Sequence, residues 1–433
     1  MFLNDIKHDW IGKVPSHWDV KRVKHLFHIK QEISENPEDE EVLSLTFGGI
    51  IKRDITTNEG QLPATYNGYT KIYPDDIVMN PMDLRAGWVD RSKYEGIISP
   101  SYYVLNRNTE STDIRYFNYQ FQRHYKERIF FSFGQGVSYD YRWGIGKETL
   151  LNFPIIVPPP SEQNKIANYL DHKTKLIESL IDKKQKLIEL LKEKRTSFIN
   201  HCVTKGLNPN VEMKDSGVEW IGEIPISWDL RNGSTIGSYS KGKGIRKDEV
   251  VEFGEACVRY GEIYTKYELK IDSTSSFISE ETSLNSVFVN SGTLLLTGSG
   301  ETKDEIGKCI VYLGEEILWV GGDIIILEPN ENINSLFLSY LMYSECIRIQ
   351  REISGRGDII VHIYSKNFKE MKFPIPSINE QHQIVEYLDE QTQKIDSTIE
   401  KEIKRIELLK EYRTALISEA VTGKIDVREE VLA

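Results

Sequence analysis

The chain has 433 residues, of which 39% are hydrophobic and 10% aromatic, and its formal net charge at pH 7 is −12. Its length exceeds what one ordinary core holds and indicates two or more domains, while its apolar content excludes a mostly disordered chain. No apolar run approaches the roughly 20 residues of a membrane span, and the N-terminal residues lack the basic-then-apolar order of a signal peptide. The sequence therefore predicts a cytoplasmic protein.

The four cysteines, Cys202, Cys257, Cys309 and Cys346, stand apart from one another and from any histidine cluster. Such isolated cysteines are typical of reduced thiols, and they predict no metal site. The net negative charge counts at first against nucleic acid, because phosphate binders are usually basic. The acidic residues are unevenly spread, however, so basic loops remain available and the charge alone decides nothing.

The first 160 residues predict a mixed α/β domain followed by a long helix. Short strands are expected at Val42–Leu45, Asp76–Met79 and Ser101–Leu105, and a helix over residues 113–130. After three prolines, Ser161 is predicted to cap a helix that begins at Glu162. Apolar residues at helical spacing then continue to about residue 200: Ile166, Leu170, Ile177, Ile181, Ile188, Leu191 and Phe198.

The second half of the chain predicts the same plan. Strands are expected at Ala256–Tyr260, Thr293–Leu296 and Ile324–Leu327, and a helix over residues 334–351. A second long helix is expected from about Asn379, and its apolar stripe consists of Ile384, Leu388, Ile395, Ile399, Ile406, Leu409 and Leu416.

Each long helix is expected to have about 38 residues, or about 57 Å at 1.5 Å per residue. Their narrow apolar stripes are of the kind that coiled coils bury. The first helix is net basic and the second net acidic, so pairing with each other is favourable, and a pseudo-two-fold relation between the halves requires an antiparallel pair. The alternative is that each helix packs on its own domain, which rarely needs so long a helix with so narrow a stripe.

An internal duplication relates the two halves and is the most informative feature of the sequence. Residues Trp10–Asp19 return as Trp220–Asp229. In the same order, Tyr119, Gly134 and Gly136 return as Tyr340, Gly355 and Gly357, and the segments Phe153–Ile155, Glu162–Asp171 and Leu190–Thr196 return as Phe373–Ile375, Glu380–Asp389 and Leu408–Thr414. The match is strong at the edges of the domains and weak inside them, which predicts one scaffold with two divergent surfaces.

Together these motifs resemble the specificity (S) subunit of type I restriction-modification systems. The resemblance is carried by Phe153–Asp171 and Trp10–Trp18, by the copies of both segments in the second half, and by the Gly-x-Gly stretches. In addition, Val78–Asp83 and Ser99–Tyr102 are similar to a frequent subtype of the first recognition domain. The matching motifs span nearly the whole chain.

The resemblance implies an α+β chain in which two mixed α/β target recognition domains are separated by two long helices, which form an antiparallel coiled coil within a pseudo-two-fold internal repeat. The expected boundaries are residues 1–160 and 206–376 for the recognition domains, and 161–205 and 377–433 for the central and C-terminal helices. Each domain is then expected to grip one half of a bipartite double-stranded DNA target with a non-specific spacer. The helices are expected to dock two modification subunits, which two restriction subunits can join. S-adenosylmethionine and ATP are expected on those partners, and no cofactor on this chain.

The motifs that would make the chain itself an enzyme are missing from the sequence. Residues 157–161 lack the polar first residue and the aromatic of an amino-methyltransferase loop. The glycine-rich residues 297–303 lack the Walker spacing, and Pro74–Asp75 is not followed by the partner residues of a nuclease site. We therefore predict a chain that is not an enzyme.

The two Gly-x-Gly loops are the strongest candidates for DNA contact, because bare backbone and hydroxyls suit phosphates and longer side chains reach base edges. The first loop offers Ser132, Gly134, Gln135, Gly136, Ser138, Tyr139 and Arg142, with Gln135 and Arg142 as readers of bases. The second offers Gly355, Arg356, Gly357, His362 and Tyr364. A basic loop with Lys241, Lys243, Arg246 and Lys247 is expected to grip phosphates, and Arg85, Arg91 and Lys93 are weaker candidates. The alternative for each loop is a solvated turn.

Two other functions remain open. The chain could be the recognition part of a fused single-chain restriction-modification enzyme, but such chains carry a cofactor motif ahead of the recognition halves, and here the first half starts at Trp10. It could also be a coiled-coil scaffold that does not bind DNA, but such a scaffold does not need two divergent, loop-rich domains.

Overall fold

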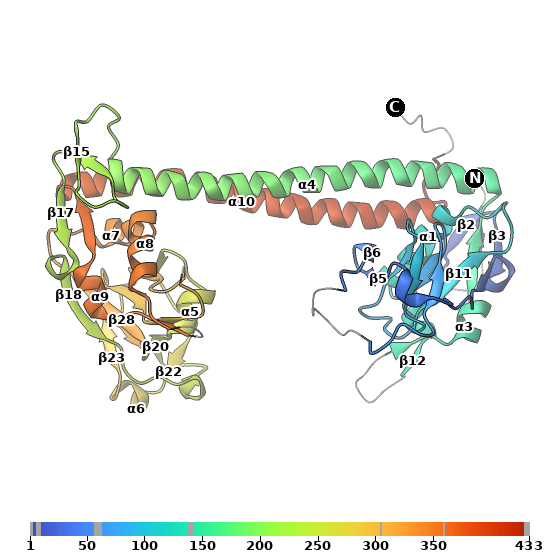
Figure 1. The fold of residues 1–433 in the computed structure, drawn as a ribbon, viewed down its shortest axis with the longest axis horizontal. Coiled ribbons are helices and arrows are strands. Elements are labelled where there is room, and N and C mark those ends of the chain that lie inside the picture. The colour runs from blue at the N-terminus through green and yellow to red at the C-terminus, as the bar shows by residue number, and fades with distance from the viewer. Residues whose placement is uncertain are drawn as a thin grey trace. The chain divides into compact units, whose positions relative to one another are not determined.

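The computed structural model describes residues 3–5, 10–55, 63–136, 143–303, 305–357 and 360–427. The chain divides into two compact units (Figure 1). Unit 1 contains Met1–Lys184 and Lys404–Ala433, and unit 2 contains Gln185–Ile403. Each unit thus holds one mixed domain and a segment of each long helix. No helix in the described ranges is long and apolar enough to cross a membrane.

The two long helices are α4, Pro160–Lys205, and α10, Ile378–Val421. At 46 and 44 residues they are longer than expected. The prediction that Ser161 caps α4 is wrong: the helix already begins at Pro160, whose missing N–H costs nothing in a first turn, and the carbonyl of Pro159 accepts from the N–H of Gln163 at 3.0 Å. Glycines with positive φ, Gly206 at +78° and Gly423 at +69°, follow the two helices.

The domain of unit 1 is built from short strands and three helices. Its elements are β1 Leu3–Asp5, β2 Lys13–Pro15, β3 Asp19–Arg22, β4 Phe27–Ile29, β5 Leu43–Thr46, β6 Gly49–Lys52, β7 Thr70–Ile72, β8 Ile77–Met79, β9 Val89–Arg91, β10 Gly96–Ile98, β11 Tyr103–Arg107, α1 Ile114–Lys126, α2 Ile129–Phe133, β12 Gln135–Gly136, β13 Trp143–Gly144, α3 Lys147–Asn152 and β14 Pro154–Val157. The three predicted strands are present as β5, β8 and β11. The predicted helix over residues 113–130 is divided between α1 and α2, because Arg128 adopts a left-handed conformation with φ of 56°.

The domain of unit 2 contains more strands. Its elements are β15 Met213–Asp215, β16 Glu223–Pro225, β17 Asp229–Asn232, β18 Gly237–Lys241, β19 Val250–Val251, β20 Glu255–Val258, α5 Tyr260–Thr265, β21 Lys270–Ile271, β22 Phe277–Ile278, α6 Glu280–Ser283, β23 Val287–Val289, β24 Leu294–Thr297, β25 Ser299–Gly300, β26 Cys309–Tyr312, β27 Leu318–Val320, β28 Ile324–Pro329, α7 Ser335–Met342, α8 Glu345–Ser354, β29 Val361–His362, α9 Ser365–Glu370 and β30 Lys372–Ile375. The predicted strands are present as β20, β24 and β28. The predicted helix over residues 334–351 is divided into α7 and α8.

The two domains repeat the same central sheet. In unit 1 the order is β4-β11-β8-β9, and in unit 2 it is β18-β28-β24-β26, with β21 added beyond β26. Two smaller pairs are also repeated, because β3 pairs with β14 as β17 pairs with β30, and β1 pairs with β2 as β15 pairs with β16. Unit 2 has in addition a second five-stranded sheet, β19-β22-β20-β27-β23. The duplication seen in the sequence is therefore a duplication of the fold.

The repeated tryptophan motif attaches each domain to the start of the long helix that follows it. In unit 1 the buried indole N–H of Trp18 donates to Glu162 at 2.9 Å, and in unit 2 that of Trp228 donates to Glu380 at 3.0 Å. Hydrogen bonds to a carboxylate are stronger than neutral ones. The Glu residue of the repeated Glu-Gln pair is therefore a structural anchor in both halves.

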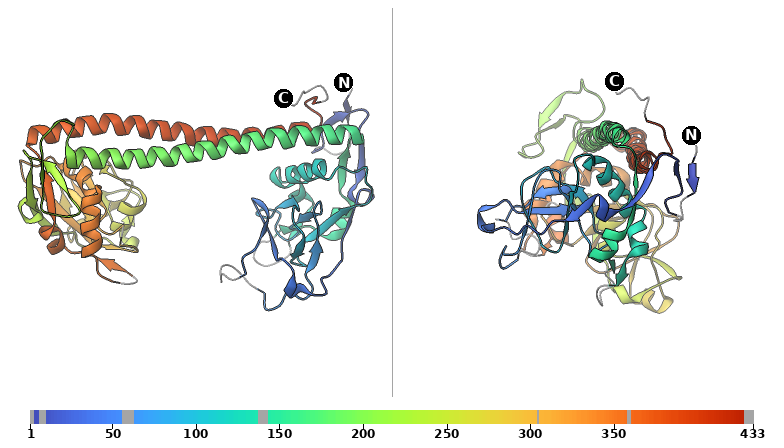
Figure 2. Two further views of the ribbon diagram at one scale, coloured as in Figure 1. Left: turned by 45° about the horizontal axis from the view of Figure 1, so that its top comes forward. Right: turned by 90° about the vertical axis from the view of Figure 1, so that its right-hand side faces the viewer.

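Other residues of the repeated Glu-Gln motif fix α1 of unit 1 and α7 of unit 2 against the long helix, as Figure 2 shows for α1 beside α4. The side chain of Gln163 accepts from the N–H of the residue before α1 at 3.0 Å, and Gln381 does the same before α7 at 2.7 Å. About two turns further on, Asp171 accepts from the hydroxyl of Tyr119 at 2.9 Å, just as Asp389 accepts from its counterpart Tyr340 at 2.6 Å. Burial raises the pKa of both phenols, which keeps them protonated as donors.

Within each unit a segment of α4 also contacts a segment of α10. In unit 1, Glu178 of α4 pairs with Arg413 of α10 at 3.0 Å. In unit 2, Arg195 of α4 pairs with Asp396 of α10 at 2.9 Å, and the rings of Phe198 and Tyr387 lie 5.5 Å apart. These contacts occur in addition to the packing of both segments on the domain of their own unit.

Candidate nucleic-acid interface

The first Gly-x-Gly segment forms one strand of a small hairpin in unit 1. Gln135 and Gly136 of β12 are exposed and pair antiparallel with Gly144 and Trp143 of β13. A side chain at Gly134 would place its Cβ 2.7 Å from the ring of Trp143, so this glycine is required by close packing. Gly136 meets no such obstacle. The exposed Ser132 lies in α2, immediately before the hairpin.

Three of the predicted contact residues, Ser138, Tyr139 and Arg142, lie outside the described residues. They belong to the connection between β12 and β13, so the described part of the hairpin is its base. The indole N–H of Trp143 donates to the carbonyl of Phe131 at 2.7 Å, and the two rings are stacked. The hairpin is thereby attached to α2.

The second Gly-x-Gly segment is paired in the same way in unit 2. Arg356 and His362 exchange two backbone hydrogen bonds of 3.0 and 2.8 Å. Gly355 is again packed tightly, since a Cβ there would lie 2.8 Å from Val361, and Gly357 has a φ of +121° that other residues rarely adopt. Arg356 itself is exposed. The position of Gln135 in the first half is therefore occupied in the second half by a longer, cationic donor.

His362 and Tyr364 extend the exposed surface of the second hairpin. The rings of the two residues are nearly parallel, with centroids 6.5 Å apart, and 62% of Tyr364 is exposed. The imidazole of His362 lies 3.0 Å from the hydroxyl of Ser299 on β25, the strand that pairs with β29. The structure thus brings together Arg356, His362 and Tyr364.

The basic loop after β18 lies at the same end of the central sheet of unit 2. Its backbone is bonded to the start of β28 and the end of β27, because the N–H of Gly242 donates to the carbonyl of Ile324 at 2.9 Å and that of Lys243 to the carbonyl of Val320 at 3.2 Å. Lys241 pairs with Asp323 at 3.5 Å, and Asp323 in turn accepts from Gly298 at 2.7 Å, next to the second hairpin. The side chains of Lys241, Lys243, Arg246 and Lys247 are all exposed. The chain therefore holds these four cations on an anchored loop close to the hairpin.

One further element lies beside each hairpin: the loop that follows β8 in unit 1 and its counterpart after β24 in unit 2. In unit 1 the loop is tied to the hairpin by the N–H of Leu84, which donates to Trp143 at 2.8 Å, and by the carbonyl of Pro81, which accepts from Ile145 at 2.8 Å. In unit 2 the counterpart forms β25, which pairs with β29. Met82 and Arg85 are exposed on the first loop. Only Arg85 was a candidate, because the contact between the loop and the hairpin joins residues far apart in the chain.

Neither unit offers an arrangement suited to a metal in the described part of the chain, where no group of three or more His, Cys, Asp or Glu side chains is placed to hold an ion. The four cysteines are buried and free. Burial raises the pKa of Cys202 and Cys257 to about 11 and that of Cys309 to about 12, so these thiols stay protonated.

The fold and its exposed loops thus define a class of protein with two related domains, each presenting a glycine-containing hairpin and cations. Comparison with known proteins gives the family. The model of the type I restriction modification DNA specificity domain matches residues 15–190 and 249–408, one match in each half. The chain belongs to this family. The prediction of a type I specificity subunit, and not an enzyme, is confirmed.

Relatives are found along nearly the whole chain. The chain is 25% identical over 384 residues to the type I restriction enzyme MjaVIII specificity subunit of Methanocaldococcus jannaschii, covering 83% of each protein. It is 22% identical to the putative MjaX specificity subunit of the same organism, covering 96% of each. The specificity subunit of EcoKI from Escherichia coli matches 47% of this chain and 44% of its own length at 25% identity.

Solved structures show the same fold. One match is a chain in a structure entitled as the basis of complex assembly and conformational transition of the type I R-M system. Its TM-score is 0.71 at 13% identity, and the match covers 95% of this chain and 100% of the other. The chain also resembles the HsdS subunit of Thermoanaerobacter tengcongensis, with a TM-score of 0.53 and 15% identity, covering 95% and 98% of the two chains. The expected mixed, two-domain repeat is therefore confirmed.

Proposed function

We propose that the chain reads a bipartite DNA target through its two hairpin surfaces, one for each half-site, across a non-specific spacer. The observation that carries this proposal is the repeated placement of a Gly-x-Gly hairpin beside the loop after β8 or β24, with different exposed side chains. Gln135 in the first half and Arg356 in the second suit different bases, because an amide pairs best with adenine and a guanidinium with guanine. A common scaffold with divergent side chains is what two different half-sites require.

The same proposal assigns the chemistry to partner proteins. Two modification subunits would bind S-adenosylmethionine and methylate adenine, and two restriction subunits with ATP would join them, while this chain supplies the address in the cytoplasm. The support is the family membership together with the relatives, which are specificity subunits of type I restriction enzymes.

We also propose that α4 and α10 pair as an antiparallel coiled coil that fixes the distance between the half-sites, with the recognition domains at residues 1–160 and 206–376. Two ion pairs support it. Glu178 and Asp396 occupy equivalent positions of the repeat, as do Arg413 and Arg195, so each helix supplies the acid of one pair and the base of the other. Such reciprocal contacts are the property of a two-fold arrangement.

Mapping the methylated adenines made by the complex of this chain with its modification subunits tests the proposed function. In Arg356→Ala, loss of a bidentate contact to guanine should cost about 1–3 kcal/mol of binding and relax only one half-site. Gln135→Ala should relax only the other. Arg231→Ala serves as control, because Arg231 lies on β17 and pairs with Asp229. Equal weakening at both half-sites, or loss of the fold, would contradict the assignment.

A further inference from the structure

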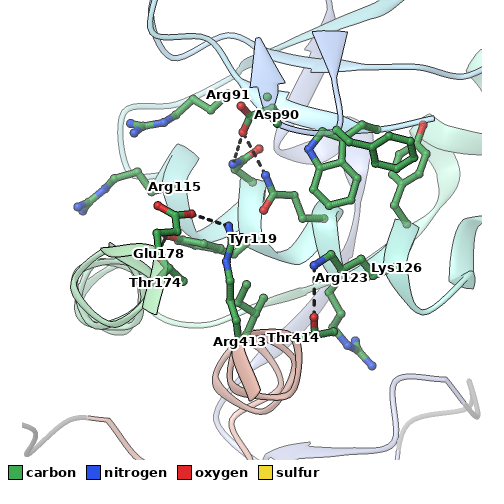
Figure 3. A pocket seen from close by; sticks show the side chains of 18 of the residues that line it. Asp90, Arg91, Arg115, Tyr119, Arg123, Lys126, Thr174, Glu178, Arg413 and Thr414 are labelled. Carbon is green, nitrogen blue, oxygen red and sulfur yellow. Dashed lines mark hydrogen bonds and ion pairs between the residues drawn. The ribbon is translucent and has the colours of Figure 1, made fainter. Parts of the chain in front are cut away.

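A pocket of about 860 Å³ lies in unit 1 among α1, α4, α10 and the loops next to β6, β8 and β9. Figure 3 shows Arg413 of α10 reaching to Glu178 of α4, next to Tyr119 of α1. Nine basic residues line the pocket but only four acidic ones, in a chain whose net charge is −12. The hairpin residues Gln135, Gly136 and Trp143 do not line this pocket, and of the loops described above the one that carries Arg85 reaches it.

The four carboxylates of the pocket already have partners. Asp90 accepts from Asn118 and Gln122, and Asp171 from Tyr119. Glu127 pairs with Arg123 at 2.8 Å, and Glu178 with Arg413 at 3.0 Å. Asp171 also pairs with Arg115 at 3.2 Å, so three of the four carboxylates are balanced by arginines of the wall, whereas the partners named for Asp90 are neutral amides.

Five lining cations, by contrast, form no ion pair within the described ranges, and all five are exposed: Arg85, Lys93, Lys126, Arg128 and Lys175. In addition, Nε of Arg413 is buried without a hydrogen-bond partner. Burial and the neighbouring Arg413 lower the pKa of Lys126, as expected where positive charge has accumulated without an anion. The pocket is thus short of negative charge.

The second half of the chain does not repeat two of these five cations. Counting onward from the equivalent residues Tyr119 and Tyr340, the positions of Lys126 and Arg128 are occupied by Ile347 and Ile349. A basic pocket required by the scaffold would be present in both halves. The cations of unit 1 therefore serve something that only this half binds in this way.

We propose that this pocket binds backbone phosphates of the DNA next to the half-site read by the first domain. The inference rests on the proposed function and adds a sequence-independent grip to it. Phosphate groups match the chemistry, because exposed Lys and Arg side chains gain the most from a ligand that carries one charge per nucleotide. The pocket then adds salt-dependent affinity in the first domain to that expected from the basic loop of the second, whereas the hairpins supply the sequence preference.

The test measures DNA affinity against salt concentration for the complete complex with its modification subunits. The triple variant Lys93→Gln, Arg128→Gln and Lys175→Gln removes three cations of the pocket. The matched control, Lys13→Gln, Lys21→Gln and Lys183→Gln, removes the same charge at exposed positions outside it. Each lost phosphate contact should reduce the slope of log affinity against log salt by about 0.9. We expect a reduction of about 2–3 for the pocket variant, none for the control, and unchanged methylated bases.

Three results would overturn the proposal. The pocket does not hold phosphate if the slope stays at its original value, and it acts as a reader of bases if the methylated sequence changes. It binds protein instead if the variant loses affinity for its modification subunits. If the triple variant does not fold, the single variant Lys175→Gln replaces it in the test, and we expect it to reduce the slope by about 0.9. If the proposed function itself were wrong, the complex of the unsubstituted chain with its modification subunits would bind DNA without any sequence preference.

Discussion

The guanidinium of Arg195 on α4 forms an ion pair with Asp396 on α10, with Nε 2.9 Å from Oδ1. Both residues belong to unit 2. The residues at the equivalent positions of the repeat, Arg413 and Glu178, form the corresponding pair in unit 1. The duplication thus preserves single contacts as well as the order of strands.

Breaking the pair in unit 2 should have a small and reversible effect. Because both side chains are partly exposed, Arg195→Asp should lower the free energy of unfolding of unit 2 by only about 0.5–1 kcal/mol. The charge swap that combines Arg195→Asp with Asp396→Arg should restore most of it. Urea unfolding of the four proteins of this cycle measures the effect, and a swap as unstable as the single variant would show that the pair contributes nothing.

The hydrogen bond between Tyr340 and Asp389 should contribute more, because Tyr340 is 1% exposed. We expect Tyr340→Phe to lower the free energy of unfolding by about 1–2 kcal/mol, since a hydrogen bond to a charged group is lost while the packing of the ring is kept. Tyr364→Phe, at an exposed tyrosine, is the control. Thermal unfolding measures the effect, and equal melting temperatures of the two variants would argue against a role of this bond in stability.

His124 should make the domain of unit 1 sensitive to acid. It is fully buried among aromatic rings, neither ring nitrogen has a hydrogen-bond partner, and burial lowers its pKa well below 6.5. Below pH 6.5 the unfolded chain therefore binds a proton that the folded chain refuses, so stability is lost as the pH falls.

The loss assigned to His124 can reach about 1.4 kcal/mol per pH unit. We expect His124→Phe to lose less stability than the original chain between pH 6.5 and 5, and substitution of the exposed His25 by Gln to change nothing. Melting temperatures measured between pH 5 and 8 check this. Parallel curves for the original chain and His124→Phe would assign the acid sensitivity to other groups.

The two glycines of the first hairpin should respond differently to alanine. A Cβ at Gly134 would lie 2.7 Å from both Trp143 and Leu84, whereas one at Gly136 would lie 3.9 Å from Trp143. Gly134→Ala should therefore cost about 1–3 kcal/mol through overpacking, and Gly136→Ala less than about 0.5 kcal/mol. Calorimetry separates the two, and equal effects would show that the hairpin base rearranges freely.

Lengthening both long helices should change the spacing of the target and leave its bases unchanged. A heptad inserted after Lys184 in α4 and another after Ile403 in α10 would add about 10 Å, or about three base pairs at 3.4 Å each. Methylome sequencing of the double insertion should show a spacer about three base pairs longer. An unchanged spacer in an active complex would mean that the helices do not set the distance.

The sequence predicted the long helices, the repeat and the main strands, because these depend on local periodicity and on residues that the two halves share. It misplaced the start of α4 and missed the breaks near Arg128 and Ser344, where chain direction depends on single backbone conformations. The structural role of the repeated Glu-Gln motif was not predicted either. Glu162 bonds to Trp18, and Gln163 bonds to the residue before α1. These contacts cannot be predicted from local sequence, because the partners are far away in the chain.

The candidate site was predictable only in part for the same reason. The Gly-x-Gly segments are visible as a recurring pattern, and the structure pairs both of them in hairpins. The loop around Arg85 becomes a neighbour of the hairpin only through the bonds of Leu84 and Pro81. The pocket beside α1 collects charges from several separate segments, and a count over the whole chain hides it beneath a negative total.

The repeated anchors also bear on how such a gene can change. Because Trp18 with Glu162 and Trp228 with Glu380 attach the two domains in the same way, and the long helices carry matching segments, recombination between related genes within these segments would exchange one whole domain and retain its anchors. The descendant would recognise a new half-site from its first generation, without passing through an unstable intermediate. If the partner subunits bind the long helices, as the resemblance implies, they would meet the same surface, and a new target could arise while the enzymes that use it stay unaltered.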